Sequence, residues 1–454
     1  MITPHIPEPM KDAPSTAAVC FAILLGAGVL ACAPGDPDQA AGIAPGASET
    51  LAFTGARLID GTGAEPIDNA VLVVRDGRVV AAGQAGVVEV PADARRVDVS
   101  GRTIIPGIIN AHGHVGQARG LEQGPEYHTR ENILDQLALY ARYGVTTVVS
   151  LGEPGYEGVA VRDAQRENAA LDHARLFVAG VVMDPDTPAE AEPQVRERAE
   201  RGVDWAKIRV DDSLGRAEKM PPATYAAVIE HSHARSLPLT AHMVHLDDAK
   251  ELVRAGADVL GHSVRDAPVD DELIALMRER NVCLHPTLTR ELSTFVYAER
   301  PAFFEDPFFL RDADAEVIRE LERPERQREY RDDAAEYYRA ALPTAQRNMV
   351  ALHQAGVRVA FGTDSGPPAR FQGYFEHVEM EMMQEAGMTP RDILLSATRV
   401  AAACMGLDEV GTLEPGRWAD FVVLERDPLE NIRHTRTIES VWIAGNRVPG
   451  AADR

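Results

Sequence analysis

The chain has 454 residues, of which 45% are hydrophobic and 26% are charged, a composition typical of a soluble globular protein with room for more than one domain. Its formal net charge of −24 argues against nucleic acid or an anionic membrane surface as a partner, because both require a basic patch. Only four of its 46 basic residues are lysines, namely Lys11, Lys207, Lys219 and Lys250.

Residues 1–32 have the pattern of an export signal. Lys11 precedes an apolar run from Ala17 to Leu30, and a positive start followed by a short apolar stretch is typical of a signal peptide. The run is too short to span a membrane comfortably. It ends in VLAC, which resembles a bacterial lipobox and predicts that Cys32 is the lipid-bearing first residue of the mature protein. The alternative is an ordinary cleaved signal with an incidental cysteine.

If the protein is exported, the residues after Cys32 link it to a membrane, and its other cysteines are in an oxidising compartment. Residues 33–49 are rich in Ala, Gly, Pro and Asp, so we expect a flexible tether that leaves Cys32 at a membrane of the bacterial periplasm or outer membrane. Cys20 would be removed with the signal, and Cys283 and Cys404 lie in apolar contexts. The sequence therefore predicts no disulfide framework, despite the export.

A β-rich region begins near Leu51. Residues 70–80 contain two β-branched runs joined by Asp76 and Gly77, a dipeptide that tolerates the positive φ angles of a tight hairpin. This first segment is too short for a complete sheet domain. Residues 420–425 and 440–448 show the same strand-turn-strand pattern. We therefore expect residues 50–103 and 408–450 to fold together.

Between these segments, residues 104–407 alternate short apolar runs with helical stretches, which is the pattern of βα units around a parallel sheet. The runs number eight, enough to close a barrel. The predicted strands are residues 104–112, 145–151, 176–182, 205–210, 237–243, 259–263, 282–288 and 357–362, with an insertion at 289–342. Such barrels carry their chemistry at the carboxyl ends of the strands.

Two of these strand ends carry the most informative residues. His112 and His114 lie two positions apart, so on a strand both imidazoles face the same spot, as metal ligands do. For this pair alone, strand histidines paired with carboxylates are the alternative. Lys207 ends another strand, and an unpaired ammonium inside a barrel is costly. In a chain that otherwise uses arginine, a lysine here indicates chemistry that arginine cannot perform.

Three further polar residues end other strands. His242 or His262 alone would be an ordinary barrel histidine, and Asp364 could simply cap the segment that follows it. Chance does not readily place six such residues at five strand ends. Together they predict a metal site.

The motifs around these residues identify a family. AHGH after IIPG, DWAKI, TAHMVH, VLGHS, GTDSG and the closing GTLEPGRWADFVVLERDPLEN resemble the amidohydrolase superfamily, in particular its imidazolonepropionase-like and prolidase-like hydrolases. The similarity covers residues 53–448 and implies an α/β fold, a (β/α)8 TIM barrel with a composite β-sandwich domain formed by both termini. Carried over by position, the metal ligands are His112, His114 and Asp364 for one ion, His242 and His262 for a second, and Lys207 between the two.

The resemblance also implies a mechanism. Lys207 would react with CO2 to give a carbamate that bridges two divalent ions, which turns a buried cation into an anionic ligand. Histidine with carboxylate-like oxygen suits zinc best. A hydroxide shared by the ions would attack an amide carbonyl, and Asp364 would move the proton to the leaving nitrogen. Gly113 stands between the histidines, where the family often has alanine, but it removes no ligand.

Lys207 also separates the possible reactions. Imidazolonepropionase proper and the cytosine and adenosine deaminases use one metal and lack this lysine, so Lys207 favours a binuclear zinc enzyme that cleaves the amide bond of a dipeptide or N-acyl amino acid with an apolar or aromatic group. Hydrolysis of a cyclic amide or lactone is the alternative reaction. A non-catalytic surface lipoprotein that binds a small molecule is the alternative of another class. The sequence is compatible with a homo-oligomer.

Specificity is expected in the loops. The aromatic residues Phe303, Phe304, Phe308 and Phe309 either line a mobile lid or pack the insertion onto the barrel, and the charged run 319–340 predicts a solvated helix face. Arg209 could bind a substrate carboxylate bidentately or form a structural salt bridge. The other candidate substrate contacts are His285, His245, Tyr127 and His128.

Overall fold

In the computed structural model of the protein, residues 49–166 and 168–451 are described. The predicted signal, its lipid-bearing Cys32 and almost all of the predicted tether lie outside these residues. In the described part of the chain, none of the helices is both long and apolar enough to cross a membrane.

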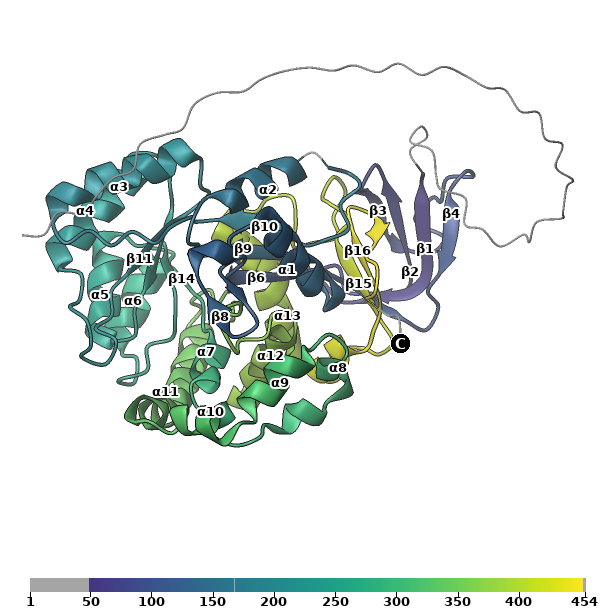
Figure 1. Ribbon diagram of the computed structural model, residues 1–454. Coiled ribbons are helices and arrows are strands. Elements are labelled where there is room, and N and C mark those ends of the chain that lie inside the picture. The colour runs from purple at the N-terminus through teal and green to yellow at the C-terminus, as the bar shows by residue number, and fades with distance from the viewer. Residues whose placement is uncertain (1–48, 167, 452–454) are drawn as a thin grey trace, which may run out of the picture. The chain divides into compact units, whose positions relative to one another are not determined.

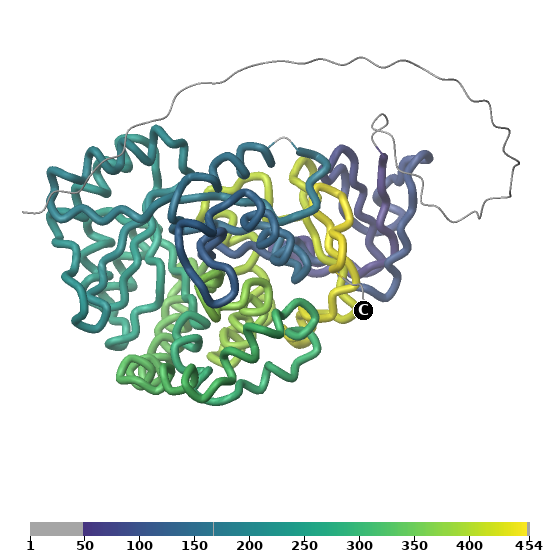
Figure 2. The backbone as a smooth tube through the Cα atoms, in the orientation of Figure 1, coloured from purple at the N-terminus to yellow at the C-terminus, as the bar shows by residue number. Residues whose placement is uncertain are grey.

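One sheet joins the two ends of the described chain. Its strands are β1 (Leu51–Leu58), β2 (Ile67–Arg75), β3 (Arg78–Gln84), β4 (Arg95–Asp98), β5 (Thr103–Pro106), β15 (Phe421–Leu424), β16 (Ile438–Ile443) and β17 (Asn446–Arg447). Their order is β17-β16-β15-β5-β1-β2-β3, with β4 paired to β1. Purple and yellow strands therefore share this sheet in Figure 1, and the tube in Figure 2 shows the two ends running beside each other.

Local sequence explains how this sheet turns and packs. Asp76 (φ 53°) and Gly77 (φ 75°) form the predicted tight turn between β2 and β3. β1 buries Phe53, whose ring meets those of Phe421 and Trp442 edge-on at centroid distances of 4.9 and 4.8 Å. Aromatic packing thus joins the first strand of the described chain to two of its last strands.

The predicted strand 104–112 is divided in the structure. β5 pairs with β1 and β15 in the terminal sheet, whereas β6 (Ile108–Gly113) pairs in parallel with β9 (Val145–Ser150). Gly107 separates them, and a Cβ atom on this residue would clash with Thr146. One continuous apolar run therefore contributes strands to two sheets, because only glycine fits against Thr146 where the chain crosses between them.

The middle of the chain forms parallel strands and helices. Besides β6 and β9, its strands are β10 (Arg175–Val178), β11 (Ala206–Arg209), β12 (Leu239–His242), β13 (Val259–Leu260) and β14 (Cys283–Leu284). They form two parallel sheets, ordered β10-β9-β6 and β11-β12-β13-β14. Single bridges link Met183 to Ile208, Leu284 to Val359 and Gly113 to Ser365. In the predicted strand 357–362, Val359 forms the bridge to Leu284, and the carbonyl of Phe361 accepts from the N–H of Ala111 in β6 at 2.9 Å.

Helices follow the parallel strands, as predicted. They are α1 (Arg130–Arg142), α2 (Glu157–Gln165), α3 (Pro188–Arg201), α4 (Pro222–His233), α5 (Leu246–Ala255), α6 (Asp271–Glu279), α11 (Asp333–Gln354), α12 (Tyr374–Ala386), α13 (Pro390–Leu395) and α14 (Ala401–Met405). In α5, Ala249, Leu252 and Val253 are buried at helical spacing and pack against the strands. A small hairpin, β7 (Ala118–Arg119) and β8 (Glu122–Gln123), lies in the loop after β6.

The insertion after β14 folds into α7 (Leu288–Ser293), α8 (Pro307–Leu310), α9 (Ala315–Leu321) and α10 (Pro324–Glu329). Phe304 and Phe309 are buried, and their stacked rings lie 5.6 Å apart at the centroids. Phe309 also meets Tyr374 of α12 at 4.9 Å. Of the two alternatives for this aromatic patch, the structure therefore has the one in which it packs the insertion onto the rest of the fold.

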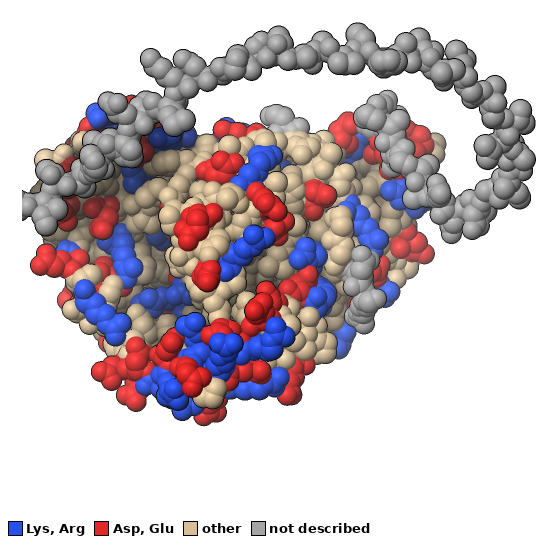
Figure 3. All heavy atoms as spheres, viewed as in Figure 1, with Lys and Arg blue, Asp and Glu red and all other residues tan. Residues whose placement is uncertain are grey.

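The charged run 319–340 carries a solvated face, as predicted. Arg323 pairs with Glu320, and Arg326 pairs with Glu329, in both cases at 2.7 Å and with exposed or half-exposed side chains. Figure 3 shows basic and acidic side chains mixed over the lower part of the view, where Figure 1 draws the green helices of this region. Exposed pairs of this kind contribute little to stability and leave the face soluble.

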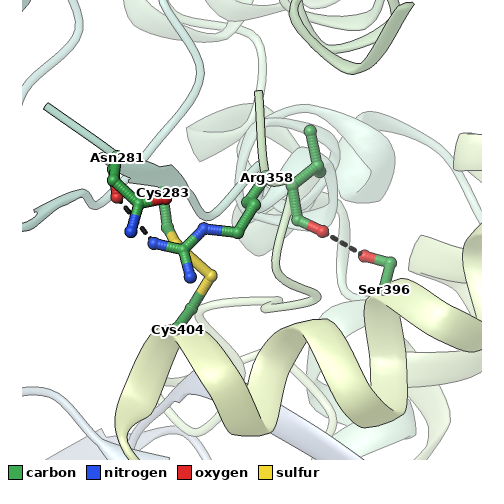
Figure 4. The surroundings of a disulfide bond; sticks show 6 residues. Asn281, Cys283, Arg358, Ser396 and Cys404 are labelled. Carbon is green, nitrogen blue, oxygen red and sulfur yellow. Dashed lines mark hydrogen bonds between the residues drawn. A yellow bond between two sulfur atoms is a disulfide. The ribbon is translucent and has the colours of Figure 1, made fainter. Parts of the chain in front are cut away.

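The prediction that the chain has no disulfide is wrong. Cys283 of β14 and Cys404 of α14 are bonded, although 121 residues separate them, and their Cα atoms lie 6.2 Å apart (Figure 4). Beside the bond, Arg358 donates to the carbonyl of Asn281 at 2.6 Å, and Ser396 donates to that of Val359 at 2.8 Å. Apolar surroundings indicated buried cysteines, but only the fold shows that the two meet.

Candidate metal centre

β6 delivers the first two predicted ligands. All six of its residues are buried, and Asn110 Oδ1 accepts a hydrogen bond from the backbone N–H of His112 at 3.0 Å. His114 follows the strand end, and its Nδ1 lies 2.9 Å from the carbonyl oxygen of Gly152. A carbonyl oxygen only accepts, so Gly152 favours a proton on Nδ1 of a neutral His114 ring, the tautomer that leaves the Nε2 lone pair for a metal ion.

Asp364 lies against both histidines. Its Oδ1 is 2.7 Å from Nε2 of His114 and 3.9 Å from Nε2 of His112. These three residues have ligand atoms within 4.8 Å of one another and could hold a metal ion. Burial opposes ionisation, but the Arg370 guanidinium, 2.6 Å from Oδ2, and the two histidines hold the pKa of Asp364 well below its usual range.

The backbone at Asp364 is held in an unusual conformation. Its φ of 58° is uncommon for a residue other than glycine. Its N–H donates to the carbonyl of His112 at 2.6 Å. The hydroxyls of its neighbours Thr363 and Ser365 donate to the buried carboxylate of Glu376 at 2.8 and 2.6 Å. This network fixes the loop so that the Asp364 carboxylate turns toward the histidines.

Lys207 of β11 reaches the same place. Its Nζ lies 3.1 Å from Nε2 of His112, and its side chain is buried. Burial lowers the pKa of Lys207 to about 7, which Arg209 reinforces and Asp364 opposes. A Cβ atom at Gly261 would lie 3.2 Å from Nζ, so the glycine leaves space beside the amine. The chain therefore holds at this point an amine that can be neutral near pH 7.

His242 of β12 and His262, just beyond β13, form a second group. The Nδ1 atom of His242 lies 2.8 Å from the Nε2 atom of His262. Their other ring nitrogens have partners, because His242 Nε2 lies 3.1 Å from Asp211 Oδ2 and His262 Nδ1 lies 2.6 Å from Thr287 Oγ1. Burial lowers the pKa of His242 to about 3 and that of His262 well below its usual range.

The donor set fits divalent metal ions. Four imidazoles, one ionised carboxylate and one amine converge on a single place, and imidazole with carboxylate is a zinc-type ligand set. The Nδ1 atom of buried His112 has no hydrogen-bond partner among the described residues, so this ring is not committed to a protein acceptor. The structure thus brings all six predicted ligands together: His112, His114, Lys207, His242, His262 and Asp364.

A cavity of about 210 Å³ opens over this group. Three guanidinium groups line it, from Arg209, Arg290 and Arg370, and its lining carboxylate is that of Asp364. Arg209 also donates to Asp211 at 3.2 Å, and its side chain is about half exposed. The salt bridge predicted as one alternative for Arg209 therefore exists, and the same side chain faces the cavity.

The other candidate substrate contacts lie outside the cavity lining. The ring of His285 is buried 5.6 Å from that of His112, and its nitrogens have no partner among the described residues. His245 precedes α5 and pairs with Asp266 at 3.4 Å. Tyr127 donates to Glu122. A Cβ atom at Gly116 would lie 2.9 Å from the ring of His128. Their roles as substrate contacts stay predictions.

Two kinds of site residue were not predicted. Arg290 of α7, which follows the seventh predicted strand, and Arg370, in the loop after the eighth, line the cavity, and Asp211 lies four residues after Lys207. Asp211 also has ligand atoms within 4.8 Å of those of Asp212 and His245. The only sequence signal for these residues is that each follows a strand end that carries a predicted ligand or candidate contact.

Comparisons with known proteins extend these findings. A sequence model of the amidohydrolase family matches residues 103–448. An uncharacterised protein of Mycobacterium tuberculosis is 26% identical over 334 residues, which cover 72% of this chain and 80% of that protein. The imidazolonepropionase of Streptomyces avermitilis is 26% identical over 442 residues, which cover 85% of this chain and 89% of that enzyme.

The fold is also found among solved structures. A Xaa-Pro dipeptidase with methionine bound in its active site matches with a TM-score of 0.71 and 21% identity, and the match covers 88% of this chain and 99% of the dipeptidase. At this identity the likeness shows the fold alone. Together with the family match, it shows a TIM-barrel-like α/β fold.

Proposed function

The chain belongs to the amidohydrolase family, and we propose that it is an exported binuclear zinc hydrolase that cleaves an amide bond beside a carboxylate. The substrates that fit best are dipeptides and N-acyl amino acids. One observation carries the proposal: Lys207, with a pKa lowered by burial to about 7, lies 3.1 Å from the first-metal ligand His112. A neutral amine at this point can form the carbamate that two ions need as a bridge.

The charges of the cavity support a carboxylate on the substrate. Arg209, Arg290 and Arg370 face it, and a guanidinium binds a carboxylate through two parallel hydrogen bonds. Arg370 is engaged by Asp364, and Arg290 by Glu291 at 3.1 Å. Arg209 is the most exposed of the three, which makes it the first candidate for the substrate carboxylate.

The residues of the chain divide the work of hydrolysis. When bound, the two divalent ions supply a hydroxide nucleophile near neutral pH and polarise the amide carbonyl. Asp364, ionised and held by Arg370, accepts the proton of the attacking water and returns it to the leaving nitrogen. Leu151 and Val182 give the cavity apolar surface for the neutral part of the substrate.

A second candidate reaction is the hydrolysis of a cyclic amide or lactone. The observation that favours it is the similarity to imidazolonepropionase over most of the chain. The resemblance to imidazolonepropionase proper would imply one metal ion and no bridging lysine. Lys207 therefore favours the binuclear candidate, and the position of its buried amine beside His112 supports this choice.

Location and domain structure complete the proposal. We place the protein at a bacterial membrane, anchored through lipid on Cys32, and the Cys283–Cys404 disulfide supports an oxidising compartment. We also infer that the eight-stranded barrel is closed, since single bridges link its two parallel sheets. The sheet that joins both ends would fold into a sandwich around the Phe53, Phe421 and Trp442 cluster.

A substrate screen tests the proposed function. The protein is loaded with zinc in bicarbonate buffer and offered three sets of compounds: dipeptides and N-acyl amino acids, the same compounds with the terminal carboxylate amidated, and cyclic amides and lactones. We expect turnover of the first set and little of the second. Preferential turnover of the cyclic set would favour the second candidate reaction. Binding of these compounds without any turnover would show a non-catalytic binding protein.

A further inference from the structure

We propose that Asp211 is a positioning residue that keeps His242 in the tautomer able to bind the second metal ion. Without Asp211, the chain should keep the first ion and bind the second weakly. This inference rests on the proposed binuclear function, and it concerns a residue that is not itself expected to touch an ion.

The contacts of Asp211 suit a positioning role. The residue is 5% exposed. Its Oδ2 lies 3.1 Å from Nε2 of His242 and also accepts from Arg209 at 3.2 Å, while Oδ1 accepts from the backbone N–H of Ser213 at 3.0 Å. An ionised carboxylate only accepts hydrogen bonds. The proton of a neutral His242 ring is therefore held on Nε2, and Nδ1 keeps its lone pair.

The free nitrogen of His242 points at the other second-site ligand. Its Nδ1 lies 2.8 Å from Nε2 of His262, whose Nδ1 lies 2.6 Å from Thr287 Oγ1. A hydroxyl both donates and accepts, so Thr287 adapts to either tautomer of His262. Asp211 does not adapt in this way. Of these two outer partners, only Asp211 therefore fixes a tautomer, that of His242, and leaves its Nδ1 without a proton.

The first site is supported differently. The Nδ1 atom of His114 is held by the backbone carbonyl of Gly152 at 2.9 Å, and that of His112 has no partner among the described residues. The Nε2 atoms of these rings face Asp364 Oδ1 at 2.7 Å and Lys207 Nζ at 3.1 Å, respectively, so neither ring depends on Asp211. A change at Asp211 should therefore act on the second site selectively, and outer hydrogen-bond partners of this type are worth about 10- to 100-fold in metal affinity.

A competing explanation makes Asp211 a ligand itself, since it could hold a cation with Asp212 and His245. The geometry favours positioning, because Asp211 lies at the Nε2 edge of His242 whereas His262 lies at the Nδ1 edge. Asp212 provides a matched control. It is a neighbouring carboxylate of the same group, and its described hydrogen bond goes to the backbone N–H of Leu214 at 3.1 Å.

The test compares zinc binding by the wild type, Asp211→Asn and Asp212→Asn, using elemental analysis and competition with a chelator. An asparagine amide can donate to Nε2 and thereby favour a proton on Nδ1. We expect about two ions in the wild type and in Asp212→Asn, and an affinity for the second ion reduced about 10- to 100-fold in Asp211→Asn. An equal loss of affinity for the second ion in Asp212→Asn would show that Asp211, Asp212 and His245 form a cation site, and it would overturn the proposal.

Other outcomes are equally decisive. A wild type that binds one ion would overturn the binuclear function itself, whereas two ions of unchanged affinity in Asp211→Asn would overturn only the role of Asp211. Should Asp211→Asn fail to fold, the ring nitrogens of the metal-free wild type can be read by 15N NMR, with His242→Gln to assign the signals. We expect a protonated Nε2 and a bare Nδ1 in His242. A protonated Nδ1 would overturn the proposal without any variant of Asp211.

Discussion

The Nζ atom of Lys207 lies 3.1 Å from the Nε2 atom of His112, and both side chains are buried. Burial, followed by the neighbouring lysine, lowers the pKa of His112 well below its usual range. Burial likewise lowers the pKa of Lys207 to about 7. An amine that is partly neutral at physiological pH is able to react with CO2, and the product would present two oxygens among the predicted metal ligands.

Replacing Lys207 by alanine should therefore remove metal and activity together. The variant loses both oxygens of the proposed bridge, so we expect metal content to fall from about two ions per chain to one or fewer. The value of kcat/KM should fall about 100-fold or more. Elemental analysis and hydrolysis assays on the same preparation measure both effects.

Two further conditions make this result specific. Lys207→Arg should do no better, because a guanidinium stays protonated and cannot form a carbamate. Propionate added to Lys207→Ala should restore part of the activity, since a short carboxylate fits the vacated space and bridges the ions. If Lys207→Ala keeps two ions and near-normal turnover, the lysine is only an ion-pair partner, and the single-metal reaction on cyclic amides takes the place of ours.

The lowered pKa of Lys207 also predicts how the stability of the metal-free protein depends on pH. In the unfolded chain this pKa has its ordinary value of 10.5, whereas in the folded chain it is about 7. Between these values the unfolded state binds more protons, so the free energy of unfolding rises with pH, by at most about 1.4 kcal/mol per pH unit. Urea unfolding in CO2-free buffer from about pH 7 to about pH 9.5 measures the slope. Lys207→Met should reduce the slope of the free energy of unfolding against pH. Equal slopes in the wild type and in this variant would contradict the lowered pKa of Lys207.

The sequence predicted that the six candidate ligands lie together, because each stands at or near the end of a predicted strand. His112 and His114 follow an unbroken apolar run, and Lys207 and His242 end β-branched or apolar segments of their own. Parallel strands present their carboxyl ends at one edge, so position along the chain translates directly into proximity. For these residues, local pattern and tertiary position carry the same information.

Residues that act across loops could not be predicted. Asp211 and His242 are 31 positions apart, and Thr287, which lies beside His262, has a positive φ of 49° in an irregular turn. Gly107 divides an apolar run between two sheets without any change in hydrophobicity. Periodicity reports which residues are buried, but it does not report which buried residues meet.

The disulfide between Cys283 and Cys404 should stabilise the protein without taking part in its chemistry. It closes a loop of 121 residues, and loss of such a bond lowers the free energy of unfolding by about 2–4 kcal/mol. We expect the double variant Cys283→Ala and Cys404→Ala to unfold at lower urea concentration while its kcat/KM at 25 °C, a temperature at which it stays folded, is unchanged. Reductant should lower wild-type stability to the same level and leave the double variant unaffected. A loss of activity in the folded double variant would contradict a purely structural role.

Cys32 should hold the protein at a membrane. A lipid anchor with more than one acyl chain exceeds what stable attachment requires, so the wild type should sediment with membranes and Cys32→Ala should appear in the soluble fraction. Cys20→Ala, which changes the apolar part of the predicted signal, is the matched control and should remain with membranes. A wild type that is already soluble, with a mature chain beginning near residue 33 or later, would show an ordinary cleaved signal.

Arg370 should set the lower pH limit of activity through Asp364. Burial alone would raise the pKa of this carboxyl, and the Arg370 guanidinium, 2.6 Å from Oδ2, is the largest influence that lowers it. In Arg370→Gln the pKa of Asp364 should therefore rise, so the acidic limb of the kcat/KM profile should move to higher pH. Loss of a hydrogen bond to a charged group costs about 1.5–3 kcal/mol, which corresponds to a decrease of about 10- to 100-fold at low pH. Arg370→Lys keeps a positive charge, so the pKa of Asp364 and the acidic limb should lie between those of the wild type and Arg370→Gln. An unchanged acidic limb in Arg370→Gln, with kcat/KM lowered equally at every pH, would show that Arg370 acts on the substrate rather than on Asp364.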